Sequence, residues 1–190
     1  MNRSARLRNE FYTRPTLEVA RDLLGCRLCR RLDSGQVLRG RVVEVEAYDG
    51  PKDRASHAHR GRTERNAAMF RSGGIAYVYL VYGVHHCLNV VAGEEGYPAA
   101  ILLRATESPL EGVSASGPGR LTRAYGIDRS FDGASLCHRE LWLERGSGVA
   151  DGEVKRTPRI GVDYAGSWSR RHYRFVIAGH PDVSGPRRHR

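Results

Sequence analysis

The sequence predicts a single α+β domain built on a largely antiparallel β-sheet, with short helices and a protruding β-hairpin. Its 190 residues are 40% hydrophobic and 27% charged, which is enough apolar surface for one buried core. Stretches of alternating apolar and polar residues recur along the chain, and the helical periods between them are short. No internal repeat or linker divides the chain, so we place one domain at residues 10–184, between basic tails at 1–9 and 185–190.

Three short helices are predicted. In residues 16–24 apolar side chains recur at the helical period, and Gly25 follows as a typical stop. Residues 63–71 begin with a threonine that can cap a helix, and two glycines come shortly after them. Residues 118–126 begin with a proline and end with a glycine, which favour the start and the end of a helix.

Segments that alternate with period two, or that are rich in β-branched and aromatic residues, predict the strands. The longest covers residues 36–48, where Glu44, Glu46 and Tyr48 share one face and apolar residues the other. This face therefore presents two carboxylates and an aromatic ring, although carboxylates spaced this way are also common on a plain solvated surface. We expect Glu44 to be solvated or to support a neighbouring group. Further strands are predicted at residues 75–82, 85–91, 99–104, 141–144, 159–162 and 173–178.

The strands at 75–82 and 85–91 flank a glycine and predict a β-hairpin with Tyr82 at or near its tip. Tyrosines are frequent in this hairpin. They can stack on bases, but a cluster of tyrosines more often serves in core or interface packing. The hairpin is thus a candidate for nucleic-acid contact only in combination with other features of the chain.

The charge distribution supplies such a feature. The formal net charge is +10, and nearly all the basic residues are arginines, which bind phosphate in a bidentate manner. Two basic arms, residues 1–71 with a net charge of +7 and residues 113–190 with +6, flank a centre with a net charge of −3. Such an excess favours a polyanionic partner, nucleic acid before membrane, although an arginine bias can also come from genome composition. The one basic residue of the centre is Arg104.

Several function classes are disfavoured. No apolar run reaches the roughly 18–20 residues of a membrane span, and no apolar stretch follows the charged N-terminus, so we expect a cytoplasmic, nucleoid-associated protein without a signal peptide. Cys26 and Cys29 have metal or redox spacing, but they fall on an alternating pattern that predicts plain core and surface thiols on opposite faces of a strand. His57 and His59 lack the glutamate of the zinc deaminase signature. Since phosphate-loop and dinucleotide motifs are missing too, we expect no metal and no cofactor.

Six segments of the chain carry distinctive motifs: VVEVEAYDGPKDRASHA (42–58), NAAMF (66–70), YVYLVYGVHHCLNVV (77–91), AAILLRATESPLEG (99–112), GPGRLTRAYGI (117–127) and WLERG (142–146). Together they resemble one family, the alkyladenine or 3-methylpurine DNA glycosylases of base-excision repair, in their bacterial form. The resemblance runs in the same order from about Phe11 to Val183, and the strand with two glutamates followed by the tyrosine hairpin is its most specific part.

The resemblance implies how a damaged base would be held. A glycosylase must swing its target nucleotide out of the duplex, and Tyr82 matches the family residue that inserts into the DNA. Tyr48 and Tyr79 match the residues that stack on the flipped purine, and His57 matches the residue that contacts it from the remaining side. Asn89 matches a residue that crowds the exocyclic amine of normal guanine. The expected partner is double-stranded DNA with a damaged purine, bound by a monomer.

The resemblance also implies the chemistry. Glu46 corresponds to the general base that deprotonates a water attacking C1′, and Arg104 to the arginine beside it. Arg120 stands where a lysine is usual and is expected to contact the DNA backbone, whereas the loop at residues 112–117 is shorter than in relatives. Because Lys52 and Lys155 are the only lysines and lie in polar, turn-rich surroundings, no desolvated amine is expected, and a monofunctional hydrolase is predicted.

Two other classes of function remain open from the residues alone. One is a non-catalytic nucleic-acid-binding module in which the tyrosines only stack on bases. The other is a metal-dependent nuclease that uses Glu44, Glu46 and Asp49.

Overall fold

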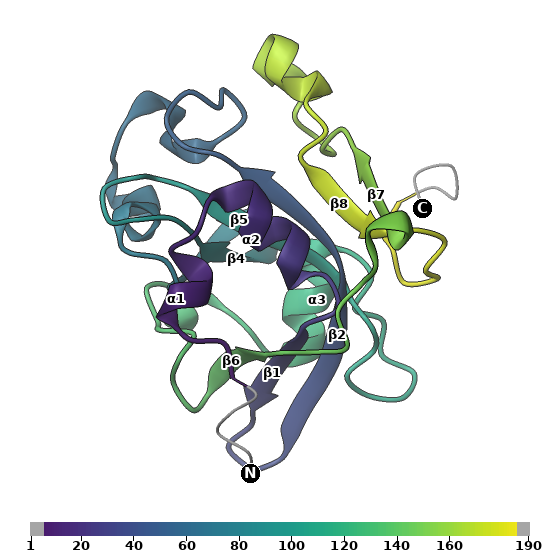
Figure 1. The fold of residues 1–190 in the computed structure, drawn as a ribbon. Helices are drawn as coiled ribbons and strands as arrows, with labels where there is room; N and C mark the ends of the chain where they lie inside the picture. Colours follow the sequence, from purple (N-terminus) through teal and green to yellow (C-terminus); the bar gives the residue numbers. More distant parts are fainter. Residues whose placement is uncertain (1–5, 186–190) are drawn as a thin grey trace.

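Eight antiparallel strands form one curled sheet with short helices around it (Figure 1). The computed structural model describes residues 6–185, and it confirms the predicted α+β class. The outer parts of the two predicted tails, residues 1–5 and 186–190, lie outside the described residues. Within the described part, the backbone of Arg6 forms an isolated β-bridge with that of Glu144, and the Leu7 side chain is buried.

Strands and helices alternate irregularly along the chain. The strands are β1 (Arg27–Arg31), β2 (Val37–Tyr48), β3 (Ala76–Val81), β4 (His85–Val91), β5 (Ala100–Thr106), β6 (Leu141–Glu144), β7 (Val154–Thr157) and β8 (Arg174–Ile177). The α-helices are α1 (Asn9–Tyr12), α2 (Thr16–Leu23) and α3 (Pro118–Tyr125). The 3₁₀-helices are η2 (His57–Arg60), η3 (Glu64–Phe70), η4 (Arg129–Phe131), η5 (Asp151–Glu153) and η6 (Asp163–Arg170).

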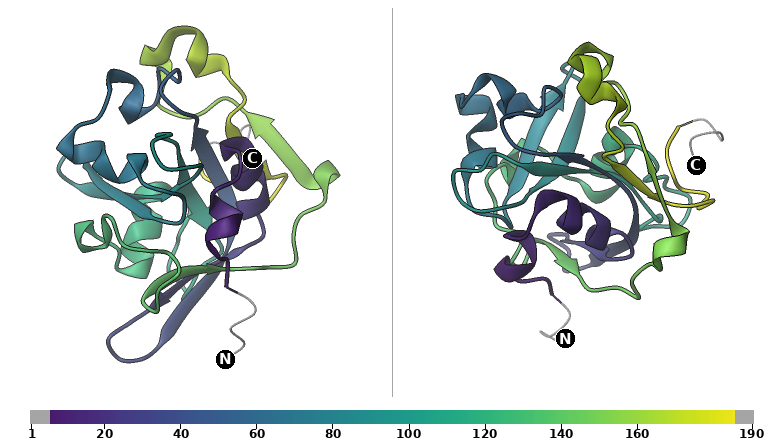
Figure 2. Two further views of the ribbon diagram at one scale, coloured as in Figure 1. Left: turned by 60° about the vertical axis from the view of Figure 1, so that its left-hand side comes forward. Right: turned by 45° about the horizontal axis from the view of Figure 1, so that its top comes forward.

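Strand β2 lies at the centre of the sheet, whose main path is β3-β4-β5-β2-β1-β6, with β8 paired to β2 and β7 paired to β8 off this path. Its first part pairs with β1, and its last part pairs with β5 and, over Glu44–Glu46, with β8. In the left view of Figure 2, β1 and β2 extend together below the body of the molecule. The register with β5 shifts around Glu44, so the strand is irregular at the first of its two carboxylates.

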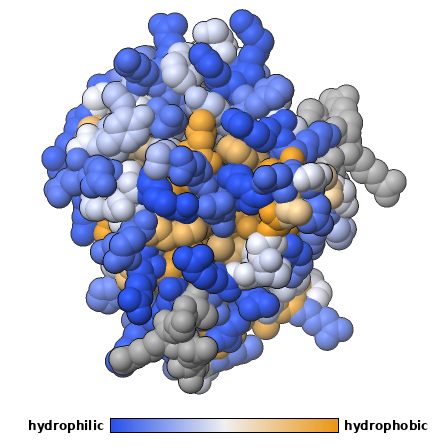
Figure 3. All heavy atoms as spheres, in the orientation of Figure 1, coloured by the Kyte–Doolittle hydropathy of each residue, from blue (hydrophilic) through white to orange (hydrophobic). Residues whose placement is uncertain are grey.

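The two faces of β2 differ as the alternation predicts. Val43 and Val45 are fully buried in one core cluster with Val19 and Leu23 of α2, so this helix covers the apolar face. Glu44, Glu46 and Tyr48 point to the opposite side, away from α2. The outer surface around α1 and α2 is mostly hydrophilic, with apolar residues gathered near its centre (Figure 3).

Three predictions about local structure need correction. Residues 64–70 form a 3₁₀-helix, although Thr63 caps it as expected. Residues 159–162 form no strand, because Pro158 lacks a donor for the sheet and Gly161 has a φ of 76°; the strand in this region is β7 instead. The Cys26 and Cys29 thiols are both buried, and not on opposite faces of one strand as predicted. Strand β1 begins only after Cys26, so the alternation of faces along the strand does not extend to this residue.

No helix in residues 6–185 is long and apolar enough to cross a membrane.

The predicted hairpin is formed by β3 and β4, and its tip is strained. Val84 N–H donates to the Val81 carbonyl at 3.0 Å, and the two residues between them, Tyr82 and Gly83, have φ values of 49° and 71°. Positive φ at both central positions is the condition for a type I′ turn, which favours Asn-Gly. Tyr82 is the sole described residue other than glycine with positive φ, and it is 95% exposed.

Replacing this tyrosine should stabilise the fold. In Tyr82→Asn we expect the free energy of unfolding to rise by about 0.5–1 kcal/mol, because asparagine tolerates the left-handed conformation better than tyrosine does. Urea denaturation of the two proteins measures the difference. Val84→Asn, which changes an exposed residue of the same tip, serves as the control. A Tyr82→Asn protein that is less stable than the wild type would contradict the strain.

Candidate active site

A pocket of about 490 Å³ opens beside the carboxylate face of β2. Its walls come from the hairpin, from η2 and η3, from β5, from the irregular residues 160–162 that follow β7, and from Tyr164 at the start of η6. Binding sites for small organic molecules commonly have volumes of about 300–1,000 Å³. The pocket therefore has room for a single ring system such as a nucleobase.

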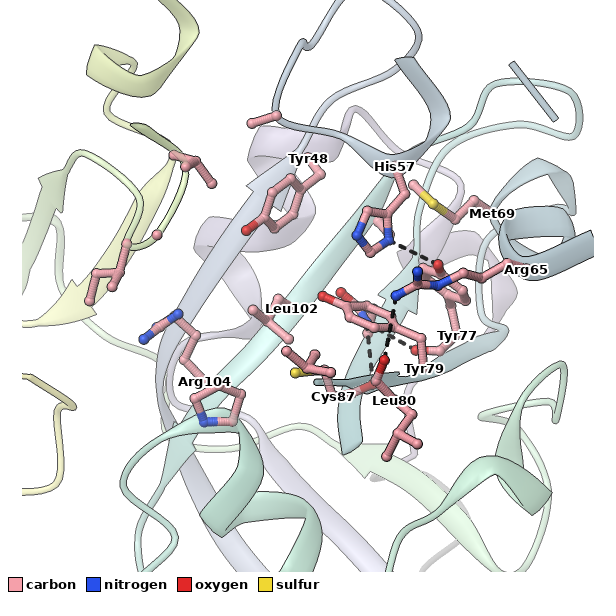
Figure 4. A pocket seen from close by; sticks show the side chains of 18 of the residues that line it. Tyr48, His57, Arg65, Met69, Tyr77, Tyr79, Leu80, Cys87, Leu102 and Arg104 are labelled. Atoms are coloured by element: carbon pink, nitrogen blue, oxygen red, sulfur yellow. Dashed lines mark hydrogen bonds between the residues drawn. The ribbon is translucent and has the colours of Figure 1, made fainter. Parts of the chain in front are cut away.

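Aromatic side chains gather around this space, as Figure 4 shows for Tyr48, His57 and Tyr79. The ring of His57 lies 4.6 Å from that of Tyr79 in an edge-on arrangement, and its Nδ1 is 3.0 Å from the Tyr77 hydroxyl. Tyr77 and Tyr79 are 5.2 Å apart at a tilt of 38°. The structure thus brings the predicted residues Tyr48, His57 and Tyr79 to one pocket and adds the buried Tyr77 as a support for His57.

The Glu46 carboxylate lies behind the pocket wall and is fully buried. Its Oε2 accepts hydrogen bonds from the Tyr48 hydroxyl at 3.0 Å and from Nη1 of Arg104 at 3.3 Å. Its Oε1 accepts a bond from the backbone N–H of Ile160 at 2.8 Å. A carboxylate offers about four lone-pair positions, so these three donors leave one position without a hydrogen bond from the described part of the protein.

Arg104 connects Glu46 to Glu44, the other carboxylate of β2. Its Nε donates to Oε1 of Glu44 at 2.9 Å, and Nη2 donates to the Ser184 hydroxyl at 3.3 Å. Glu44 also accepts a bond from Nε of Arg174 at 2.7 Å and one from the Ser184 backbone N–H at 2.6 Å. Glu44, Glu46 and Arg174 are fully buried, and Arg104 is 8% exposed. The expectation of a solvated Glu44 is therefore wrong. Its contact with Arg104 agrees with the other expectation, that Glu44 supports a neighbouring group.

A second buried ion pair lies under Tyr48. Arg159 binds Asp53 with both terminal nitrogens and donates to the Ala47 carbonyl at 2.8 Å. Its guanidinium carbon is 4.7 Å from the centre of the Tyr48 ring, so this ring is fixed from one face by a cation and at its hydroxyl by Glu46. Neither Arg159 nor Asp53 was expected from the sequence, since their contact spans 106 residues and no motif marks it.

The remaining predicted residues lie at different distances from this centre. Asn89 is buried in the pocket wall on β4, and its amide N–H groups donate to the Tyr77 and Cys87 carbonyls at 3.0 and 3.4 Å. Tyr82 lines the pocket at the hairpin tip. Arg120 is exposed on α3 and does not line the pocket, although Pro118 at the start of the same helix does.

Burial and charge shift the titration of several groups. Burial, and then the neighbouring Glu46, raise the pKa of Tyr48 well above its usual value, so its hydroxyl stays a donor. Burial lowers the pKa of His57, and the positive charge of Arg65 lowers it further. For Arg104, burial alone would lower the pKa, but Glu46 and Glu44 raise it above its ordinary value. At neutral pH the site therefore holds a protonated tyrosine, a neutral histidine and a charged arginine.

An aromatic pocket backed by a buried carboxylate, on a strongly basic chain, is typical of an enzyme that acts on the bases of nucleic acids. Comparison with known proteins agrees with this class. Residues 10–181 match the family model described as Methylpurine-DNA glycosylase (MPG).

Several relatives align over nearly their whole length. A provisionally named 3-methyladenine DNA glycosylase of Methanocella arvoryzae is 48% identical over 94% of this chain and 95% of its own. Proteins with the same name from Anaeromyxobacter sp. (strain Fw109-5) and Myxococcus xanthus are 49% and 47% identical, over 94% and 95% of this chain and 92% and 94% of theirs. The chain therefore belongs to the methylpurine-DNA glycosylase family, as the resemblance of its motifs indicated. Membership makes it a DNA glycosylase, with DNA as its partner.

The buried charges should make Arg174 essential for stability. In Arg174→Met we expect the free energy of unfolding to fall by about 3–5 kcal/mol, because Glu44 is left buried with fewer partners. Urea denaturation tests this, with Arg171→Met, at an exposed neighbouring arginine, as the control. If the free energy of unfolding falls by less than about 1 kcal/mol, Glu44 does not depend on Arg174 for its neutralisation.

The lowered pKa of His57 gives a second prediction. The histidine should gain its proton only at a pH below the usual value near 6.5, and Arg65→Gln should move this transition to higher pH by removing one repulsive charge. A histidine NMR titration follows the ring signal, which is assigned by its loss in His57→Gln. Arg62→Gln controls for the general loss of charge near η3. Equal midpoints in the wild type and Arg65→Gln would show that burial alone sets the pKa.

Proposed function

We propose that this protein is a monofunctional DNA glycosylase that hydrolyses the N-glycosidic bond of alkylated or deaminated purines in duplex DNA. Its substrates would be 3-methyladenine, 7-methylguanine, hypoxanthine and ethenoadenine, each reached by base flipping, and it would act as a monomer without a cofactor. One observation carries the proposal: a base-sized aromatic pocket lies directly against Tyr48 and Arg104, the two side chains that hold the buried Glu46 carboxylate.

The hairpin tip would open the duplex. Unstacking a base costs a few kcal/mol, and an aromatic ring placed in the gap offsets part of that cost. Tyr82 projects almost free of the protein, between the exposed Leu80 and Val84. An apolar tip of this kind, next to the mouth of a base-sized pocket, favours insertion into the stack. On α3, the exposed Arg120 would contact a phosphate of the same duplex.

The pocket would then select the flipped base. Tyr48 and Tyr79 supply ring faces, and stacking on a positively charged purine is stronger than on a neutral one because of the cation–π attraction. A neutral His57 adds no charge that would repel such a cation, and it can hydrogen-bond the base edge. Asn89, anchored to two strand carbonyls, would crowd the exocyclic amine of a normal guanine.

Glu46 would act as the general base. In the proposed step it takes a proton from a water while the water oxygen bonds to C1′ of the sugar. The bond from C1′ to the purine nitrogen breaks, and its electron pair leaves with the base. A base that carries a positive charge leaves as a neutral molecule, which makes it a better leaving group. Arg104 would hold Glu46 in place, and the carboxylate would stabilise positive charge that develops on the sugar.

The alternatives fit the geometry less well. A metal-dependent nuclease would need Glu44, Glu46 and Asp49 to face one ion, but the guanidinium of Arg104 lies between the first two and bonds to both. A module that only binds nucleic acid would not need a buried carboxylate held by two side chains that line the base-sized pocket. Removing a carboxylate from water costs several kcal/mol, and a catalytic role would explain why the protein keeps Glu46 there.

The role of Glu46 is tested by Glu46→Gln. We expect this variant to bind damaged duplexes and to release base about 10²–10⁴ times more slowly, because the proton acceptor is lost. Release is measured as free base and as alkali-labile sites in four duplexes, each with one of the substrate bases. Glu94→Gln, at an exposed position, is the control. Failure of the wild type to release any of the four bases would refute the proposed function, whereas unchanged release in Glu46→Gln would refute only the role of this residue.

The proposed lack of lyase activity gives an independent test. A bifunctional enzyme forms a Schiff base through an amine, and both lysines of this chain are exposed and outside the pocket. We expect borohydride to trap no covalent complex between the protein and DNA during turnover. A glycosylase known to form such a complex serves as the positive control. A trapped adduct would show that an amine takes part.

A further inference from the structure

A second hollow of about 440 Å³ adjoins the base pocket. The two share His57 and Tyr164 as a common wall, and the second hollow continues toward η2 and η6. In Figures 1 and 2 these two segments lie at the same end of the molecule, η2 in blue and η6 in yellow-green. The second hollow is therefore within reach of a strand whose base enters the first pocket.

The walls of this hollow have the chemistry of a nucleotide site. Arg54 and Arg60 are exposed and contribute two guanidinium groups. The described residues that line the hollow include no aspartate or glutamate that would neutralise them. The nearest buried carboxylate, Asp53, is bound by Arg159 on the inner side. The two charges are thus available to an external anion.

Tyr164 adds an aromatic face to the two cations. Its side chain is 72% exposed, although its hydroxyl donates to the Ala55 carbonyl at 3.2 Å. The hydrogen bond fixes one end of the ring and leaves its surface open to solvent. An exposed ring held in this way costs little further entropy when a flat partner packs on it.

We infer that the hollow formed by Arg54, Arg60 and Tyr164 binds the nucleotide next to the flipped one in the damaged strand. Arg54 and Arg60 bind its phosphates, and Tyr164 packs against its base. Two arginines beside an aromatic ring are the combination that recognises an unpaired nucleotide without regard to sequence, so the neighbouring base leaves the duplex stack together with the flipped one. The inference rests on the proposed function, since it assigns the path of the strand whose base occupies the pocket.

The test measures how binding depends on salt. The DNA is a duplex with a tetrahydrofuran abasic analogue, and its affinity is followed by fluorescence anisotropy at several salt concentrations. In Arg54→Ser/Arg60→Ser we expect the slope of log affinity against log salt to be smaller by about 1.8, which is 0.9 for each phosphate that an arginine no longer neutralises. The matched control is Arg8→Ser/Arg145→Ser, which removes two exposed arginines from the groove beside α1 and α2, on the other side of β2.

A second measurement locates the phosphates. Neutral methylphosphonate linkages are placed one at a time along the damaged strand. At the contacted positions they should weaken binding by the wild type but have no further effect on Arg54→Ser/Arg60→Ser. For the ring, Tyr164→Ala should weaken binding about 5- to 150-fold, which corresponds to loss of one base stack. Tyr164→Phe should stay within about twofold of the wild type, since the ring is kept.

The outcomes separate the inference from the function on which it rests. If the wild type releases damaged bases and Arg54→Ser/Arg60→Ser keeps the salt slope of the control, the inference is wrong and the function stands. If methylphosphonate effects appear only in the undamaged strand, the hollow does not follow the flipped nucleotide and the inference is equally wrong. If the wild type releases no base from any duplex, the proposed function itself fails.

Discussion

The structure depends above all on the neutralisation of two carboxylates that β2 buries side by side. Glu44 and Glu46 have no exposed surface, and an isolated buried charge of this kind would cost several kcal/mol. Arg104 from β5 lies between them, and Arg174 from β8 adds a second positive charge beside Glu44. Strands β5 and β8 therefore bind β2 in two ways: by backbone hydrogen bonds, and by arginines that neutralise its buried carboxylates.

The same network fixes the geometry of the site. Glu46 accepts hydrogen bonds from the backbone N–H of Ile160, the hydroxyl of Tyr48 and the guanidinium of Arg104, so three separate parts of the chain set its orientation. Tyr48 is held in turn by Arg159, whose charge is balanced by Asp53. A site that is positioned before the substrate arrives needs little reorganisation during a reaction, and the proposed hydrolysis would benefit from this.

Much of this could be predicted from local sequence patterns, and the rest could not. Alternation placed Glu46 and Tyr48 on one face of a strand, and the glycine after Tyr82 marked the hairpin tip, because both features depend on neighbouring residues. The burial of Glu44 was missed because it depends on Arg174 and Ser184, 130 and 140 residues away. Arg159 was missed for the same reason, and its surroundings were interpreted as a strand although Pro158 and Gly161 prevent one.

The position of Ser184 has a consequence for the order in which the molecule is made. Ribosomes release the chain from its N-terminus, so both glutamates of β2 emerge long before Arg174 and Ser184. Until then Glu44 lacks two of its three partners, and β2 cannot be buried as it is in the finished protein without leaving charge unpaired. The central strand of the fold can thus reach its final state only after the residues up to Ser184 have left the ribosome. Closure of the site waits for a segment that is made about 140 residues after the strand it neutralises.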